Sequence, residues 1–589
     1  MNLLTKSINN LSLLLLWLVI GTGLRLTNLT AKPPWTDEFS TLVFSLGNSF
    51  ESVPLNKAIA LDVLLQPLQP NGDAGVKQVI QHLLTESNHP PLYFILAHWW
   101  MQLWQLDTGL VSLWGARSLS ALLGAASIPA IYFLSWLAFR SRLISHLAAA
   151  MIAVSPYGIF LAQEARHYTL AILWVIASLS FLVIATRYIQ VSKALPVWII
   201  VTWIAVNFLG ISTHYFFSLT LCAEAIVLLV IAVRQTQNKI ISRVPWQQIC
   251  IVAAGTIVGG LVWLPVFLQS SNAEELTQWI QSGDRSGFAW LNPIFQAAAA
   301  WITMLSLLPV EASALPVVIA SGGVMIIFFV WALPIFYRGW KTLLRQRDPL
   351  MCQVFVGVIC SAIALFFIIT YAFGIDLTRG ARYNFVYFPA VMVLVGASLA
   401  VCWNSQRRGE RQEEPVRCGG FPRCSNWRAR GKRQETRAPF FQSKFYLSTG
   451  KKAVIIIWLM GLVSGITVVN NLGYQKYYRP DLLVQLIQNN YQVPILIATT
   501  HQTHVQTGEM MGIAREFKLS ATNSPLFFLA HQDQSKPSIV LQTTLNQLPR
   551  PLDLWLVNFY APVEVISCIA DSQSLPAVDG YNYQLYHCQ

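Results

Sequence analysis

Eleven apolar runs, each long enough to cross a bilayer, limit what this 589-residue chain can fold into. The runs lie near residues 11–29, 113–139, 144–161, 168–186, 195–211, 214–233, 249–268, 315–337, 351–373, 383–403 and 453–471. In lipid, backbone polar groups must be satisfied within the segment, which favours helices. With 54% hydrophobic and only 11% charged residues, the chain is too apolar for a soluble globular protein. We therefore expect an all-α polytopic membrane protein.

The basic residues predict the orientation. In a soluble protein the net charge of +13 would suggest a nucleic-acid partner, but here it follows the positive-inside pattern of membrane proteins. With eleven spans, 25 of the 40 Lys and Arg residues fall in the N-terminal segment and in alternate loops. We expect a multi-pass plasma (inner) membrane protein with a cytoplasmic N-terminus and no nucleic-acid partner. The first run lacks a small-residue cleavage site after it and is interpreted as a retained signal anchor.

Two further apolar stretches, 91–106 and 291–309, are ambiguous. Counting both as spans would place the basic loops at 140–142, 187–193 and 234–243 on the outer side, against the positive-inside rule. The first stretch contains Trp99, Trp100 and Trp104, and the second contains Trp301 and directly follows Trp290. Trp is common in helices that lie in the membrane interface. We interpret them as juxtamembrane helices on the outer face.

The C-terminal third changes character. Residues 404–452 form an Arg-rich loop, expected in the cytoplasm, and 453–471 the last transmembrane helix. Residues 472–589 mix strand-like runs (494–499, 538–543, 552–559 and 583–587) with helical ones (481–488 and 509–517), which predicts a small extracytoplasmic α/β domain. Cys568 and Cys588 both fall in it, so a disulfide is plausible in an oxidising compartment but open from sequence.

Ionisable residues gather in the segments that this topology places outside. Asp37 and Glu38 follow the first span, where adjacent carboxylates are costly unless they have a function. Taken alone, they would equally well hydrate the start of a loop. The turn at 162–168 carries Glu164, Arg166 and His167, more than a short turn needs for solubility, which favours a functional role.

Four more outer residues join this group. His89 precedes the first juxtamembrane helix, and His214 lies in the turn at 211–215, where a lone histidine is commonly just interfacial. Arg382 and Tyr383 lie in the last short outer loop, where the guanidinium fork suits a phosphate group. Such groups could deprotonate a hydroxyl while holding a phosphate leaving group. A lipid-linked phosphosugar fits this site, whereas a soluble nucleotide sugar does not, since no nucleotide-binding glycine loop is present.

In this ordered series the chain resembles the GT-C glycosyltransferases, and within them the bacterial relatives of the protein O-mannosyltransferase and lipid A aminoarabinose transferase families. The resemblance covers about residues 1–400 and rests on Trp35-Thr36-Asp37-Glu38, His89-Pro90-Pro91-Leu92-Tyr93, Arg117-Ser118-Leu119-Ser120, Glu164-Ala165-Arg166-His167-Tyr168 and Arg382-Tyr383. It implies a GT-C module over residues 1–403, with about eleven transmembrane helices plus juxtamembrane helices.

The resemblance also implies an activity and roles for residues. The enzyme would move a sugar, hexose or pentose, from a polyprenyl-phosphate donor to a hydroxyl of a glycan, lipid or protein acceptor at the outer membrane face, with inversion. Asp37 would be the general base, Glu38 would assist it or help to hold a metal, and Glu164 would be a further catalytic residue. The donor phosphate would be bound by His89, Arg166, His167, Arg382 and Tyr383.

A metal and the function class stay open at this point. Some members of the family use a divalent cation, so Mg, Mn or Zn could bind, with Asp37, Glu164, His89 and His214 as candidate ligands. The aminoarabinose enzyme carries Lys where His89 stands, which leaves a metal or acid/base role for that histidine. A transporter or flippase of lipid-linked sugars, or an oligosaccharide ligase or polymerase, remains an alternative. Sequence identifies neither the sugar nor the acceptor.

Overall fold

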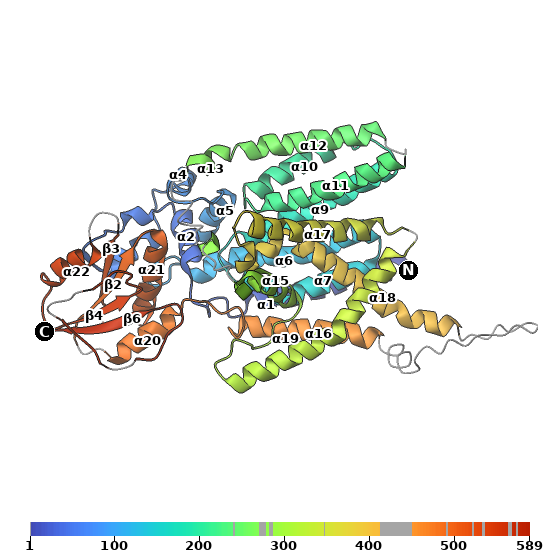
Figure 1. Ribbon diagram of the computed structural model, residues 1–589. Coiled ribbons are helices and arrows are strands. Elements are labelled where there is room, and N and C mark those ends of the chain that lie inside the picture. The colour runs from blue at the N-terminus through green and yellow to red at the C-terminus, as the bar shows by residue number, and fades with distance from the viewer. Residues whose placement is uncertain are drawn as a thin grey trace, which may run out of the picture.

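The computed structural model describes residues 2–238, 242–269, 279–281, 287–346, 348–412, 450–490, 493–520, 524–532, 536–563, 568–572 and 575–589. It consists of a bundle of long helices with an α/β domain at one end (Figure 1). The N-terminus lies at the other end of the bundle. Most of the predicted basic loop, residues 413–449, lies outside the described part of the chain.

The bundle confirms the helical membrane architecture. Its helices are α1 (Asn2–Leu26), α6 (Leu113–Phe139), α7 (Arg142–Val154), α8 (Pro156–Ala162), α9 (Tyr168–Gln190), α10 (Val197–Ile211), α11 (Phe217–Gln237), α12 (Arg243–Leu261), α13 (Leu264–Gln269), α15 (Asn292–Leu305), α16 (Leu315–Leu344), α17 (Leu350–Ala372), α18 (Phe388–Gln412) and α19 (Gly450–Val469). All eleven predicted runs are helical. In the described residues, nine helices are long and apolar enough to cross a membrane, or ten if the bent pair α7–α8 is one span. The chain is a multi-pass membrane protein.

The set of candidate spans differs from the prediction in detail. α10 and the apolar part of α1, Asn10–Leu26, are shorter than the other candidate spans. Gly287–Leu305, by contrast, is long and apolar enough to cross a membrane. We predicted 291–309 as an interfacial helix. Its α-helical part, α15, has 14 residues and rises only about 21 Å, less than the ~30 Å hydrocarbon core.

α7 and α8 bend by 57° at a break where a buried arginine satisfies the backbone carbonyls. Pro156 has no N–H, so the carbonyl of Ile152 loses its helical partner. Arg25 of α1 donates from Nη2 to this carbonyl at 3.0 Å, and from Nη1 to the carbonyls of Ala153 at 3.0 Å and Gly21 at 2.9 Å. The charged side chain of Arg25 thus satisfies backbone oxygens inside the membrane protein.

The long first outer loop folds into short elements: α2 (Thr36–Ser45), η1 (Phe50–Ser52), β1 (Ala58–Ala60), α3 (Leu61–Leu64), η2 (Gln66–Leu68), α4 (Val76–Glu86) and α5 (Leu92–Met101). Near the same end of the bundle lie the 3₁₀ helices η3 (Gly287–Leu291), η4 (Leu377–Arg379) and η5 (Ala381–Val386). α5 was one of the two ambiguous stretches, and its ten residues are too few to span a bilayer.

The C-terminal domain is built on one mixed sheet, with strand order β1-β3-β2-β4-β6-β5. Its elements are α20 (Pro480–Asn490), β2 (Ile495–His501), α21 (His504–Leu519), β3 (Leu526–His531), α22 (Pro537–Leu545), β4 (Leu552–Val557), β5 (Cys568–Ala570) and β6 (Tyr583–Cys588). β2, β3 and β4 are parallel, and β6 runs antiparallel to β4. The predicted strand at 538–543 is wrong, because this segment is helix α22.

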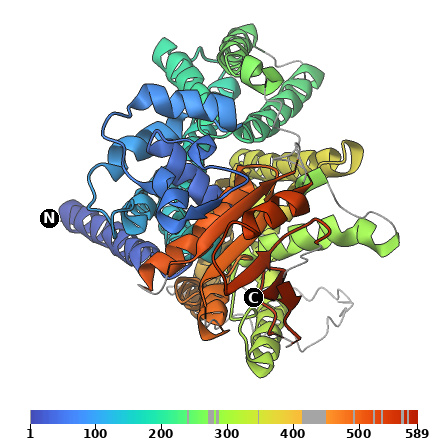
Figure 2. The same ribbon diagram turned by 90° about the vertical axis from the view of Figure 1, so that its left-hand side faces the viewer.

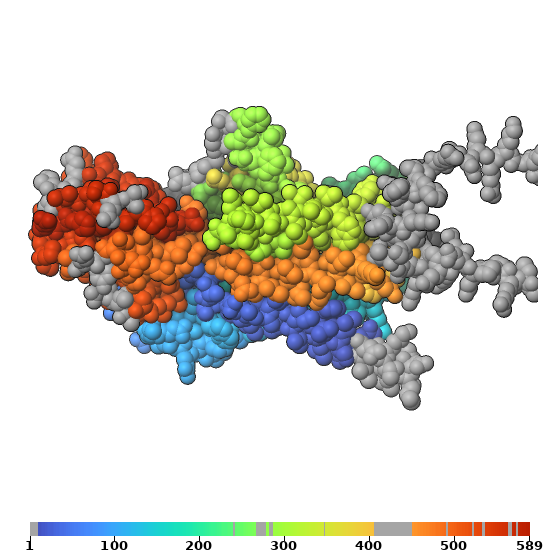
Figure 3. Space-filling view, turned by 90° about the horizontal axis from the view of Figure 1, so that it is seen from below, coloured from blue at the N-terminus to red at the C-terminus, as the bar shows by residue number. Residues whose placement is uncertain are grey.

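The tail and the first loop share one core. β1 of the first loop pairs with β3 of the tail, and Phe39 of α2 packs in the same apolar cluster as Met510 and Met511 of α21. Viewed from the sheet side, the α/β domain therefore sits directly on the first-loop helices (Figure 2). From below, α19 lies between α16 and α1 on one face of the bundle (Figure 3).

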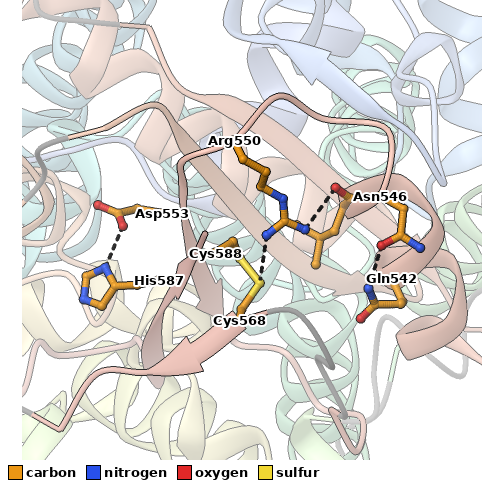
Figure 4. Close-up of a disulfide and its surroundings, with 8 residues drawn as sticks. Gln542, Asn546, Arg550, Asp553, Cys568, His587 and Cys588 are labelled. Atoms are coloured by element: carbon orange, nitrogen blue, oxygen red, sulfur yellow. Dashed lines mark hydrogen bonds and ion pairs between the residues drawn. A yellow bond between two sulfur atoms is a disulfide. The ribbon is translucent and has the colours of Figure 1, made fainter.

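Cys568 and Cys588 form a disulfide, the pairing that sequence left open. The two residues are directly opposite each other in the β5–β6 ladder, so the bond ties the edge strand to its neighbour (Figure 4). Arg550 lies beside it, with Nη1 at 3.6 Å from the Cys568 sulfur.

Candidate active site

The site begins at the N-terminus of α2. Asp37 and Glu38 lie in the first helical turn, where exposed backbone N–H groups favour negative charge. Successive residues of a helix point about 100° apart, so the two carboxylates face different surroundings. The Asp37 side chain remains 31% exposed, whereas that of Glu38 is fully buried.

Asp37 lies between two guanidinium groups. Its Oδ2 is 3.4 Å from Nη2 of Arg166 and 3.7 Å from Nη2 of Arg382. Arg166 also donates from Nη1 to the backbone carbonyl of Asp37 at 2.7 Å and to the hydroxyl of Thr41 at 3.1 Å. The first loop, the turn before α9 and the loop before α18 therefore converge on one carboxylate.

The charge balance keeps Asp37 ionised. Burial alone would raise its pKa, but the positive charges of Arg166 and Arg382 outweigh burial and hold the pKa below the ordinary value. In this state the carboxylate is a weak base. An anion that drew the guanidiniums away from it would raise its basicity.

Glu38, which the resemblance assigns to assisting Asp37 or holding a metal, is hydrogen-bonded to other groups. Arg117 donates to both of its oxygens, from Nε and from Nη2, each at 2.8 Å, and the N–H of Ala165 donates to Oε1 at 2.8 Å. Arg117 also donates to the carbonyls of Leu29 and Lys32 at 2.8 and 2.9 Å. Through these bonds Glu38 ties α2 to the turn that carries Arg166.

His89 lies beside Arg166 rather than facing open space. Arg166 donates from Nη2 to His89 Nε2 at 3.0 Å, and the other ring nitrogen lies 3.0 Å from the Ser87 hydroxyl. An arginine can only donate, so Nε2 is the acceptor and the proton sits on Nδ1. Burial and the nearby Arg166 lower the pKa of His89 to about 3, which keeps the ring neutral. The geometry makes His89 a positioning residue for Arg166.

Glu164 forms an ion pair with a residue from the tail, Lys476. The same ammonium lies 4.9 Å from the ring centroid of Trp35, and the guanidinium of Arg382 lies 4.6 Å from that ring. Trp35 thus contacts two cations, one of which also pairs with Asp37. Cation–π contacts of this kind fix the direction of a guanidinium without neutralising it.

Histidines and aromatics line the other side of Arg166. The His167 ring lies 5.5 Å from that of His89 and 4.6 Å from that of His214. Neither ring nitrogen of His167 has a hydrogen-bond partner among the described residues, although the side chain is buried. Tyr383 stacks under the Arg382 guanidinium at 5.5 Å. His167 therefore keeps hydrogen-bonding capacity for a bound molecule.

Two tail residues at the site were missed from the sequence. Lys476 follows the last span and pairs with Glu164, and His504, the first residue of α21, is close enough for its charge to affect Asp37. His504 also stacks on Phe50 of the first loop at 5.1 Å. Neither residue stands in a motif, since its place depends on how the tail docks on α2.

The four candidate metal ligands, Asp37, Glu164, His89 and His214, each have another partner. Within the described part of the chain, no three His, Cys, Asp or Glu residues are grouped closely enough to hold a metal ion. Asp37 faces two guanidiniums, Glu164 faces an ammonium, and the Nε2 lone pair of His89 points at Arg166. His214 accepts the N–H of Phe216 at its Nδ1. Metal binding stays a prediction.

A separate cavity lies away from this centre. Its volume is about 470 Å³, and it opens between α9, α11 and α17, with Arg234 and Gln353 at its polar end. None of the residues around Asp37 line it. The Asp37 cluster lies at the other end of α11.

The fold is that of a multi-pass membrane protein, and two guanidiniums surround one carboxylate at the end that carries the α/β domain. No family model matches the chain, and no curated protein matches it. Among solved structures, it is similar to ArnT from Cupriavidus metallidurans bound to undecaprenyl phosphate, at 11% identity and a TM-score of 0.45, over 99% of this chain and 98% of that one.

A second similar structure is the archaeal oligosaccharyltransferase AglB from Archaeoglobus fulgidus in complex with an inhibitory peptide and a dolichol-phosphate. Identity is 11% and the TM-score 0.43, over 86% of this chain and 64% of that one. The same oligosaccharyltransferase in complex with Zn and sulfate matches at 12% identity and a TM-score of 0.41, over 85% and 61%. These similarities do not decide function, which is inferred from the Asp37 cluster.

Proposed function

We propose that the chain is an integral-membrane glycosyltransferase that moves a sugar from a polyprenyl-phosphate donor to an acceptor hydroxyl. The observation that carries the proposal is the placement of one carboxylate, Asp37, between the guanidiniums of Arg166 and Arg382. Guanidiniums bind phosphate well, and a carboxylate beside them can accept a proton. A lipid-linked donor suits a site at the end of a membrane bundle.

In the proposed reaction, Asp37 Oδ accepts the proton of the acceptor hydroxyl as its oxygen attacks the anomeric carbon. The bond from that carbon to the phosphate oxygen breaks with inversion, and the polyprenyl phosphate leaves as an anion held by Arg166 and Arg382. Because the two arginines neutralise the leaving phosphate, no general acid is needed to protonate it. His89 and Trp35 orient the two guanidiniums, and Tyr383 and His167 line the donor pocket.

Donor binding itself would activate the base. In the structure, Asp37 forms ion pairs with both arginines. When a phosphate takes over these ion pairs, the pKa of Asp37 rises towards and above its ordinary range because burial is then no longer compensated. Proton abstraction would therefore begin only once the donor is present.

We also propose that the site faces outward from the plasma membrane. The N-terminus and the basic loops that join α6 to α7 and α9 to α10 lie at the end of the bundle opposite the α/β domain (Figure 1). The C-terminal ends of α11 and α16, which carry Arg234 and Lys341, lie at the same end. The positive-inside rule puts that end in the cytoplasm. A disulfide in the α/β domain agrees with an oxidising outer compartment.

Transfer from a defined donor tests the proposal. The full-length protein in sealed proteoliposomes receives a radiolabelled polyprenyl-phosphate hexose or pentose together with an extract of cell-envelope acceptors. Asp37→Asn removes the base at constant shape, so transfer is expected to fall at least 10³-fold. The matched control is Asp62→Asn, an acid of the same loop that is 72% exposed and pairs with Lys518; it should retain wild-type transfer.

Other outcomes of this assay point to other classes. Full activity of Asp37→Asn would remove Asp37 as the base. If wild type moves the labelled donor across the bilayer without forming a new glycoside, the protein is a flippase. If only donors with a preassembled glycan are used, it is an oligosaccharide ligase or polymerase.

A further inference from the structure

Two strongly exposed tyrosines lie at the edge of the α/β domain that faces the bundle. Tyr477 is 73% exposed and Tyr560 is 71% exposed, the first in the linker after α19 and the second after β4. Tyr560 lies within electrostatic reach of Tyr477. Two large aromatic side chains left in solvent in one region of the domain indicate a recognition surface.

The fold places Tyr560 where ligands commonly bind in α/β domains. The chain passes from β2 through α21 to β3, and then through α22 to β4 on the other side of β2. The gap between the ends of β2 and β4 is thus a topological switch point, and such crevices bind ligands at the carboxyl ends of the strands. The Tyr560 N–H donates to Thr500 Oγ1, near the end of β2, at 3.3 Å.

These strand ends face the active site. β6 ends at the chain terminus, on the side of the sheet far from the bundle, and β4 runs antiparallel to it (Figure 1). β2, β3 and β4 therefore end on the side of the bundle. α21, which starts there, contacts the catalytic helix: a methyl group on Gly508 would lie 3.5 Å from the Cα of Thr36, the residue before Asp37.

The same helix supports the tyrosines. Glu509, next to Gly508, accepts a hydrogen bond from Asn558 Nδ2 at 3.3 Å and lies close to Tyr478 and Tyr560. Since a helix is only about 10–12 Å across, the tyrosine surface and the start of α2 are separated by about the width of α21. One side of α21 thus meets the catalytic helix and another meets the tyrosines.

The segment that carries Tyr477 is held in place. Lys32 Nζ donates to the carbonyls of Gly473 and Tyr474, each at 3.1 Å, and Tyr474 stacks on Phe160 at 4.2 Å. Lys476 pairs with Glu164 in the catalytic turn. Tyr477 is therefore exposed on a fixed backbone, and ordering it on binding would lose little conformational freedom.

The surface is mainly aromatic. Tyr477 packs on Tyr478, with ring centroids 5.2 Å apart, and Tyr478 on Tyr581 at 5.6 Å. Glu509 beside it is buried, which raises its pKa, and Arg479 pairs with Asp481 at 2.7 Å. Aromatic faces beside amide and hydroxyl groups suit a sugar ring, which presents C–H groups to the ring and hydroxyls to its rim.

We propose that Tyr477 and Tyr560 form a platform for a saccharide acceptor, which they hold with its hydroxyl directed to Asp37. The inference rests on the proposed transferase function and specifies its acceptor: a glycan or the glycan part of a larger molecule. The two rings position the acceptor and do not take part in proton transfer. The neighbouring Asn558 is held by Glu509 and supports the Tyr560 ring through a 3.5 Å contact with its hydroxyl.

The test is glycan binding by the full-length protein in detergent on an immobilised glycan array. Wild type is expected to retain at least one class of glycan, and the double variant Tyr477→Ala/Tyr560→Ala to bind it at least tenfold more weakly. Tyr477→Phe/Tyr560→Phe keeps the rings and should bind nearly as wild type. Ile569→Ala, a 70% exposed side chain on edge strand β5, is the matched control and should be unchanged.

The outcomes separate this inference from the transferase function. Asp37→Asn should bind the array as wild type does while failing in sugar transfer. Equal binding by the double alanine variant, or no retained glycan with wild type, would overturn the platform even if transfer to another acceptor is seen. If the alanine variants instead lose membrane insertion and keep glycan binding, the tyrosines are interfacial anchors and the proposal is wrong.

Discussion

At the scale of residues, two adjacent acids perform different tasks. Asp37 keeps 31% of its side chain exposed and faces two arginines that hold it loosely, at 3.4 and 3.7 Å. Glu38 is fully buried and bound at both oxygens by Arg117. The sequence indicates that this acidic pair is functional. Only the structure shows that neighbouring positions of the helix turn the two carboxylates towards different partners.

The Glu38–Arg117 pair should be needed for stability. Removal of one partner from a buried ion pair leaves an uncompensated charge and typically costs about 3–5 kcal/mol. Arg117→Met is therefore expected to lower the melting temperature of the purified protein markedly. Thermal unfolding followed by size exclusion measures this.

The control for that experiment is Arg479→Met, which removes a partly exposed partner of Asp481. Exposed pairs contribute roughly 0–1 kcal/mol, so its melting temperature should be close to that of wild type. An Arg117→Met protein as stable as this control would show that the buried pair does not hold α2 in place.

At the scale of elements, apolar periodicity predicted the bundle well, because a membrane helix needs only a long run of apolar residues. All eleven predicted runs are helical. The elements of the tail were harder to predict. The Val, Leu and Thr content of residues 538–543 predicts a strand, but the segment forms α22. Pro537 stands at the start of this helix, where proline is favourable. β1, three residues long, carries no signal of its own and exists because it pairs with β3.

The site residues also divide into those that the sequence could reveal and those that it could not. The residues in the outer turns, Asp37, Glu164, Arg166 and Arg382, could be found because charge is rare and conspicuous beside a span. Lys476 and His504 could not, because a charged residue in a polar tail is ordinary. Their roles follow from the docking of the tail on α2, through contacts that no local pattern encodes.

At the scale of the whole molecule, the first loop and the tail close over one end of the bundle. They share a core around Phe39 and Met511, and Lys476 reaches from the tail to the catalytic turn. The division of the chain into a membrane module at 1–403 and an outer domain at 472–589 remains a proposal. The shared sheet and core show that the outer domain also includes part of the first loop.

The orientation of the whole molecule can be measured directly. An alkaline phosphatase fused after Ser572, in the α/β domain, should be active outside the membrane, and one fused after Gly409, near the end of α18, should be inactive. Western blots control for expression of both fusions. Activity at Gly409 would reverse the proposed topology and place the Asp37 site in the cytoplasm.

The account as a whole depends on the arginines around Asp37 being a phosphate site. The most direct test is the dissociation constant of undecaprenyl phosphate for the purified protein, followed by the fluorescence of Trp35 and its neighbours. We predict that Asp37→Asn binds at least as tightly as wild type, since the competing carboxylate charge is gone, although it cannot transfer sugar. Arg382→Gln should bind at least tenfold more weakly. Equal affinity in all three proteins would contradict the account.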